Sequence, residues 1–179
     1  MWESVRLWVD LNVSGNLYKD EIYMKNEFDE MPTKNYEKFK VIASELDVAA
    51  FVDFTSTVAK VLLFTDIPEE ILDKIKFHYS EIDDFKKDLV VSSSTKEDVP
   101  IVSISWLLED IQKVLPYVGD ALLQKELIES AELFRNYINR FLTEKKCPRC
   151  NTLLFLSDLP QYDYVCSECD ENFDSFELR

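Results

Sequence analysis

All four cysteines of the chain lie in its last 33 residues, in two pairs with the same internal spacing. Cys147 and Cys150 form the first pair, Cys166 and Cys169 form the second, and fifteen residues separate the pairs. Two thiolates that are three positions apart can converge on one metal ion at about 2.3 Å, and two such pairs complete a tetrahedral site. The spacing therefore predicts a metal centre around which the tail folds.

The residues after each pair favour a tight turn. Asn151 follows the first pair and Asp170 follows the second. Metal-binding turns often need a positive φ there, and Asn and Asp tolerate it best after glycine. Over residues 145–179 this pattern resembles the zinc-ribbon family and, more loosely, rubredoxin. The resemblance implies a ribbon fold with a structural Zn²⁺, but no particular activity, because ribbons occur in transcription factors, polymerase subunits, ribosomal proteins and enzymes. Iron in the same four sulfurs, two disulfides and free thiols are the alternatives.

The length of the chain suggests one larger domain and a small metal module. Its first 146 residues are enough to bury a hydrophobic core, whereas a module of about 33 residues needs metal binding for much of its stability. We expect an α+β body at 1–100, a helical segment packing on that body at 101–146, and a zinc ribbon at 147–179.

Hydrophobic periodicity predicts a ββαββα-like body, with helices against an antiparallel sheet. Alternating or β-branched apolar residues indicate four strands, at 4–13, 17–24, 48–54 and 58–64. Apolar residues at three- and four-residue spacing indicate one helix capped by Thr33 and a second opened by Asp66 and Pro68.

A long helix is predicted immediately before the cysteines. Asp120 is suited to cap it, and an apolar stripe from Leu123 to Phe141 suggests that it extends to about Lys146. At 1.5 Å per residue such a helix would be about 39 Å long.

The chain is strongly acidic, with a formal net charge of −15. Residues 147–179 contribute −5, which leaves −10 for residues 1–146. Nucleic-acid affinity depends largely on Lys and Arg contacts to phosphate, so direct nucleic-acid binding is not expected. A protein partner with a basic groove or patch suits this charge better, and a surface that only keeps the protein in solution is the alternative.

Few residues suit catalysis. The chain has one histidine, His78, and two glycines, so neither a histidine-based triad nor a glycine-rich phosphate loop is expected. Asp10, Asp53 and Asp66 each follow or interrupt an apolar run. On neighbouring strands they could bind Mg²⁺ as in a metal-dependent nuclease. The favoured explanation is that strand alternation directs Asp10 and Asp53 to solvent and that Asp66 caps a helix.

The turn between the two expected ribbon strands offers candidate partner contacts. They are Asp158 in the turn and the alternating Tyr162 and Tyr164 beyond it. The tyrosines could instead form the small core of the ribbon with Phe155 and Phe173.

No run of eighteen apolar residues occurs, and the N-terminus does not resemble a signal peptide, so we expect neither a membrane helix nor secretion. Cysteines confined to metal spacing favour an intracellular setting, cytoplasmic or nuclear. We therefore expect a non-enzymatic accessory or regulatory protein that binds a protein of the transcription or replication machinery. A nuclease using the three aspartates, an acidic inhibitor that mimics nucleic acid, and an iron-based electron carrier are the alternatives.

Overall fold

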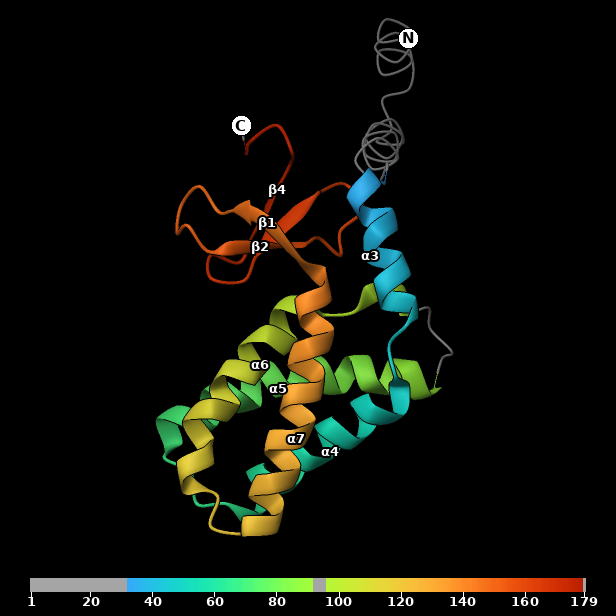
Figure 1. The fold of residues 1–179 in the computed structure, drawn as a ribbon. Helices are drawn as coiled ribbons and strands as arrows, with labels where there is room; N and C mark the ends of the chain where they lie inside the picture. Colours follow the sequence, from blue (N-terminus) through green and yellow to red (C-terminus); the bar gives the residue numbers. More distant parts are fainter. Residues whose placement is uncertain (1–31, 92–95, 179) are drawn as a thin grey trace, which may run out of the picture.

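The computed structural model describes residues 32–91 and 96–178 (Figure 1). The strands predicted at 4–13 and 17–24, and Asp10 with them, lie outside the described residues. In chain order the elements are α3 (Lys34–Ser44), α4 (Val48–Phe64), α5 (Glu69–Val91), the 3-10 turn η1 (Lys96–Asp98), α6 (Ile101–Val114), the 3-10 turn η2 (Leu115–Tyr117), α7 (Ala121–Ile138), the 3-10 turn η3 (Asn139–Phe141), β1 (Leu142–Lys146), β2 (Leu153–Leu156), β3 (Tyr164–Cys166) and β4 (Glu171–Phe173).

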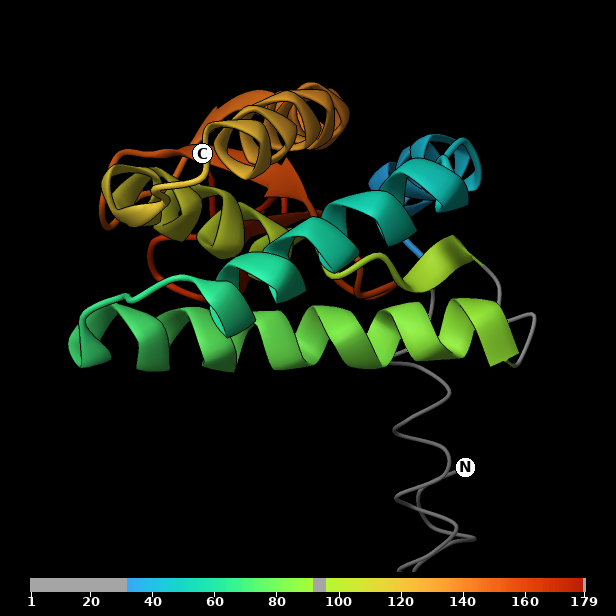
Figure 2. The same cartoon turned by 90° about the horizontal axis from the view of Figure 1, so that it is seen from below.

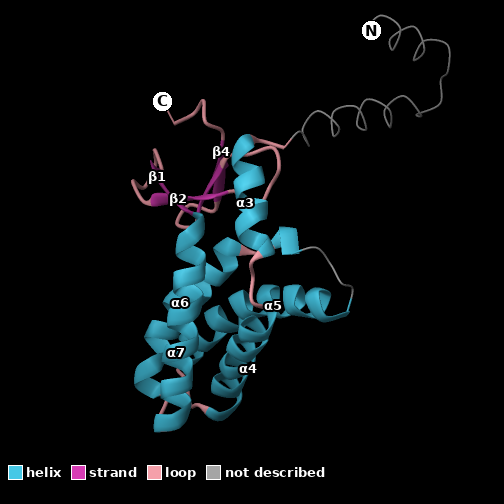
Figure 3. Cartoon of the chain, turned by 45° about the vertical axis from the view of Figure 1, so that its right-hand side comes forward, coloured by secondary structure: helices cyan, strands magenta, loops and turns pink. Residues whose placement is uncertain are grey.

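The α+β class is confirmed, but the described strands all belong to the C-terminal ribbon (Figure 3). The prediction of strands at 48–54 and 58–64 is wrong, because these residues form one helix, α4. Its buried side chains recur at helical spacing, at Phe51, Phe54, Thr55, Val58 and Val61. The β-branched content of the segment suggested strands, but burial along one helical face outweighs that preference.

Thr55, Ser56 and Thr57 separate the two predicted strands, and such polar residues are typical of a turn. Each hydroxyl instead donates to a backbone carbonyl one helical turn earlier. Thr55 donates to Phe51 at 3.0 Å, Ser56 to Val52 at 2.7 Å and Thr57 to Asp53 at 3.0 Å. Such bonds satisfy small polar side chains inside a helix, so the triplet does not interrupt α4.

Helices α4 to α7 enclose the main core. Helix α4 packs against α5 and α7, and α6 packs against the same two helices. Figure 2 shows α4 lying obliquely above α5 and approaching it toward the C-terminal end of α4. Phe51 of α4 meets Phe85 of α5 at 5.5 Å between ring centroids, and Phe54 stacks on Phe134 of α7 at 4.9 Å. The predicted starts of two helices are confirmed, since Thr33 caps α3 and α5 begins just after Pro68.

Helix α7 begins as predicted but ends eight residues early. The Asp120 carboxylate accepts hydrogen bonds from the amides of Leu122 and Leu123 at 2.8 and 2.9 Å, which confirms the predicted cap. The helix stops at Ile138, so the predicted extension to Lys146 is wrong. Residues 142–146 form strand β1 instead, because they pair with β2 in the ribbon.

The ribbon is an antiparallel four-stranded sheet in the order β1-β2-β3-β4. Side chains alternate between its faces. Phe155 and Val165 are cross-strand partners and belong to the same buried core as the helices. Leu154, Tyr164 and Phe173 form a second, smaller core with Cys147 and Cys166. The ribbon is therefore packed onto the helical body, while the division of the chain at residues 100 and 146 stays a prediction.

Within the described ranges, no helix is both long enough and apolar enough to cross a membrane.

Candidate metal centre

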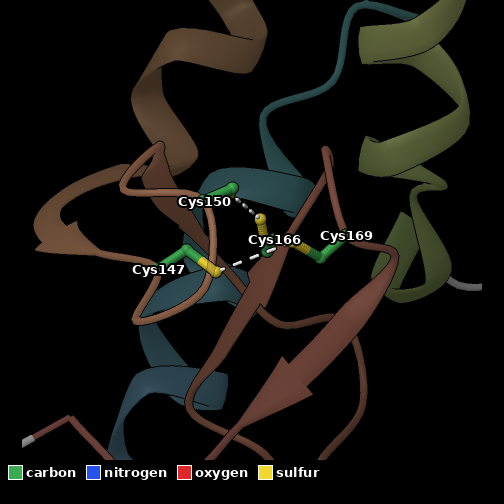
Figure 4. A group of neighbouring side chains, drawn as sticks. All are labelled: Cys147, Cys150, Cys166 and Cys169. Atoms are coloured by element: carbon green, nitrogen blue, oxygen red, sulfur yellow. Dashed lines mark hydrogen bonds between the residues drawn. The ribbon is translucent and has the colours of Figure 1, made fainter.

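The four cysteines come from two turns that face each other across the ribbon (Figure 4). Cys147 and Cys150 lie in the turn between β1 and β2, Cys166 is the last residue of β3, and Cys169 lies in the turn that follows it before β4. Their Sγ atoms all lie within 4.8 Å of one another. The structure thus gathers side chains that are up to 22 residues apart in the chain into one cluster.

The distances between the sulfurs fit a single central ion. Cys147 Sγ lies 3.8 Å from Cys169 Sγ, and Cys150 Sγ lies 3.5 Å from Cys166 Sγ. Four sulfurs at 2.3 Å from a tetrahedral ion are about 3.8 Å apart, whereas a disulfide brings two sulfurs to about 2.05 Å. All four residues are free thiols. The cluster can therefore hold a metal ion.

The backbone of both turns has the predicted conformation. Asn151 has φ of 65° and Asp170 has φ of 50°, and they are the two non-glycine residues with positive φ in the described part of the chain. The first turn is closed by the Asn151 amide, which donates to the Cys147 carbonyl at 2.9 Å, and by the Cys147 amide, which donates to the Thr152 carbonyl at 2.8 Å. These turns aim the paired sulfurs at one point.

Arg149 links the two turns. Its amide donates to Cys147 Sγ at 3.4 Å, and its guanidinium lies 2.6 Å from the Glu171 carboxylate at the start of β4. An amide directed at a sulfur stabilises the thiolate form that a metal ion requires. The ion pair joins the first turn to the strand that leaves the second.

The thiols differ in acidity. Hydrogen bonding with Thr152 lowers the pKa of Cys150 to about 6. Burial raises the pKa of Cys166 to about 11, and hydrogen bonding with Cys150 raises the pKa of Cys169 to about 12. One thiolate thus makes its neighbours harder to ionise. A divalent cation among the sulfurs would reverse this effect, because it favours the thiolate form of every ligand.

No protein-family model, curated protein or solved structure matches this chain. The likeness to zinc ribbons therefore rests on the cysteine spacing, the two positive-φ turns and the clustered sulfurs.

A tryptophan from the helical body supports the second turn. The indole Nε1 of Trp106, on α6, donates to the carbonyl of Ser167 at 2.8 Å. Ser167 lies between the two cysteines of this turn and is buried. The hydrogen bond thus ties the backbone that carries Cys166 and Cys169 directly to a helix.

The tryptophan is held in turn by the single histidine. The rings of Trp106 and His78 lie 5.1 Å apart, and His78 Nδ1 lies 2.7 Å from the buried Asp110 carboxylate. The second oxygen of Asp110 accepts a hydrogen bond from Lys113 at 2.8 Å. His78 therefore joins α5 to α6 beneath the ribbon. Sequence reasoning missed this contact, since a lone tryptophan and histidine on different helices gave no sign that they meet.

The candidate partner contacts differ in exposure. Asp158 is half-buried in the turn after β2, and burial raises its pKa. The carbonyl of half-buried Tyr162 accepts a hydrogen bond from Thr33 at 3.3 Å. Tyr164 is buried in the small ribbon core with Phe173, which favours the core interpretation of this residue. Partner binding by these three residues stays a prediction.

The aspartates of the nuclease hypothesis are not brought together. Asp53 is exposed on α4, and Asp66 lies beyond the end of that helix. From Asp53 to Phe64 the helix alone extends roughly 16 Å. Among the described residues, the four cysteines are the one cluster with the geometry of a metal site. Because Asp53 is helical, the premise of carboxylates on neighbouring strands no longer holds.

Proposed function

We propose that the chain binds one Zn²⁺ ion as a structural centre through Cys147, Cys150, Cys166 and Cys169. The convergence of the four sulfurs is the observation that carries this proposal. Four thiolates complete a tetrahedral shell and leave no position open for a substrate or a reactive water. Zinc in this site stabilises the fold.

Zinc suits these ligands better than the harder cations do. A tetrahedral shell of four thiolates is typical of zinc and of iron–sulfur centres, whereas Mg²⁺ and Ca²⁺ prefer oxygen ligands. Iron would give the purified protein a red colour, and zinc would leave it colourless. Metal analysis of the purified chain therefore separates the two ions directly.

The wider function that we propose is that of a non-enzymatic accessory or regulatory protein inside the cell. It binds a protein component of the transcription or replication machinery that has a basic groove or patch. The net charge of −15 supports a basic partner. The C-terminal ribbon supports a role in transcription or replication only by resemblance, because zinc ribbons are frequent in the proteins of these machineries.

Crosslinking in cells with a tagged chain tests the wider function. The expected result is enrichment of a transcription or replication protein, with crosslinks to a basic surface of it. Recovery of proteins from neither machinery would contradict the proposal. A matched nuclease assay with Mg²⁺ should show no cleavage, and cleavage abolished by Asp66→Asn would favour the enzymatic alternative.

A further inference from the structure

A hollow of about 480 Å³ is lined by residues of the helical body. Figure 1 shows that the segments that supply these residues lie at the end of the body opposite the ribbon. We call this hollow the tip hollow. It lies between the end of α4, the turn η2 and the first turn of α7. These segments meet because the connections α4–α5 and α6–α7 reach the same end of the body.

The walls of the tip hollow include large apolar side chains that are exposed to water. Phe64 is 79% exposed, Leu122 is 67% exposed and Tyr117 is 43% exposed. Single exposed apolar residues are ordinary on protein surfaces, but several around one hollow mark a site of interaction. Aromatic rings and an aliphatic chain that line the same hollow suit an inserted apolar side chain.

The rim of the hollow is acidic. Asp66, Asp120 and Glu126 line it together with one cation, Lys60, which lies 3.7 Å from Glu126. The potential around the apolar walls is therefore negative, and it favours a ligand that combines apolar and positively charged groups.

We propose that the tip hollow binds a basic amphipathic segment of a protein partner. One leucine or aromatic side chain of that segment inserts between Phe64, Tyr117 and Leu122, and its lysines or arginines face Asp66 and Asp120. This inference rests on the proposed function, because it assigns a surface to the basic partner named there. It places that surface far from the ribbon turn that carries Asp158 and Tyr162.

The charge of the rim argues against two other occupants. Nucleic acid is repelled by it, because phosphates need cations. A second copy of the chain would have to place the same acidic rim against itself in a two-fold contact, which brings like charges together. A segment rich in lysine or arginine meets neither obstacle.

A designed peptide tests the proposal. The probe is a fluorescein-labelled helix former of about eighteen residues, with leucines at i, i+3, i+4 and i+7 and lysines elsewhere. Fluorescence anisotropy with the full-length, zinc-loaded chain should show saturable binding that weakens with added salt. Phe64→Ser and Leu122→Ser should each weaken binding about tenfold, and Asp66→Asn should reduce its dependence on salt.

Leu133→Ser is the matched control, because Leu133 is also an exposed leucine of α7 and does not line the hollow. It should leave peptide affinity unchanged. Absence of saturable binding up to about 1 mM peptide, or equal loss of affinity in all three serine variants, would overturn the proposal. A dimer that Leu122→Ser dissociates would also overturn it, in favour of a second copy.

Metal content and crosslinking keep this test separate from the proposed function. If the chain holds zinc and crosslinks to a basic protein but ignores the peptide, only the tip hollow loses its role. If no basic partner is found while the peptide binds at the hollow, the wider function fails and the binding surface stands.

Discussion

Replacing Trp106 with phenylalanine removes the indole N–H that donates to the Ser167 carbonyl, and leaves an aromatic ring in place. Loss of one hydrogen bond costs about 0.5–1.5 kcal/mol, and a buried carbonyl left without a donor costs about 1–3 kcal/mol. Ser167 is only 5% exposed, so the higher range applies. We expect Trp106→Phe to lower the free energy of unfolding by about 2 kcal/mol.

Part of that loss should appear as weaker metal binding, because the carbonyl belongs to the turn that carries Cys166 and Cys169. A factor of ten in affinity corresponds to about 1.4 kcal/mol, so zinc affinity should fall roughly tenfold. Competition with a chromophoric chelator measures the affinity, and urea unfolding followed by circular dichroism measures the stability.

Tyr137→Phe is the matched control. The Tyr137 hydroxyl donates to the carbonyl of Ile42 at 3.3 Å, and this hydrogen bond joins α7 to α3 without involving either cysteine turn. This substitution also deletes one side-chain donor to a backbone carbonyl between two elements. It should cost about 1 kcal/mol of stability and leave zinc affinity unchanged. Equal zinc affinity in Trp106→Phe and Tyr137→Phe would refute the assignment of Trp106 as a positioning residue of the metal centre.

Three further predictions concern helix α4, Asp158 in the turn after β2, and the backbone of the first cysteine turn at Asn151. Ser56→Pro should unfold α4, because proline inside a helix costs about 3 kcal/mol or more. The control Ser56→Ala should change the urea midpoint little. A stable proline variant would favour two strands at 48–54 and 58–64 instead of the helix. Burial raises the pKa of Asp158, so the folded state loses stability as the pH rises above 3.8, through the raised pKa. Asp158→Asn should therefore be more stable than the natural chain at pH 7.5, by a margin that shrinks at pH 4.5, and an unchanged margin would contradict this. Asn151→Ala should lower the free energy of unfolding by about 1 kcal/mol, because alanine is strained at the positive φ, whereas Asn151→Gly should change it by less than about 0.5 kcal/mol. Equal thermal midpoints of these two variants would contradict the need for a positive φ at this position.

The metal centre could be predicted from the sequence because the residues that determine each cysteine turn are close together in the chain. Two residues between paired cysteines fix a turn, and Asn151 and Asp170 are among the few residues that accept the positive φ which this turn needs. The spacing of the pairs then leaves room for one hairpin. Each pair of ligands and the turn that carries it are therefore encoded within a few residues.

The structure of residues 48–64 could not be predicted in the same way. The β-branched and aromatic residues there are compatible with either a strand or a helix. Which of the two forms depends on what the segment packs against. Phe51 and Phe54 meet Phe134 of α7, which lies some eighty residues later in the chain. That partner becomes visible only in the folded molecule.

The end of α7 depends on a distant partner as well. The apolar stripe continues to the buried Phe141, so periodicity alone gives no reason to stop at Ile138. The chain leaves the helix because Leu142 pairs with Phe155 in the ribbon sheet. The Trp106–Ser167 hydrogen bond joins residues 61 positions apart and has no sequence signature either.

The central claim is one zinc ion in a four-thiolate structural site, and X-ray absorption at the zinc edge with elemental analysis tests it most directly. We predict one zinc per chain, a first shell of four sulfurs at about 2.3 Å, and loss of that shell in Cys166→Ser. Iron in the purified protein, nitrogen or oxygen ligands in the shell, or a metal-free chain with two disulfides would contradict the claim.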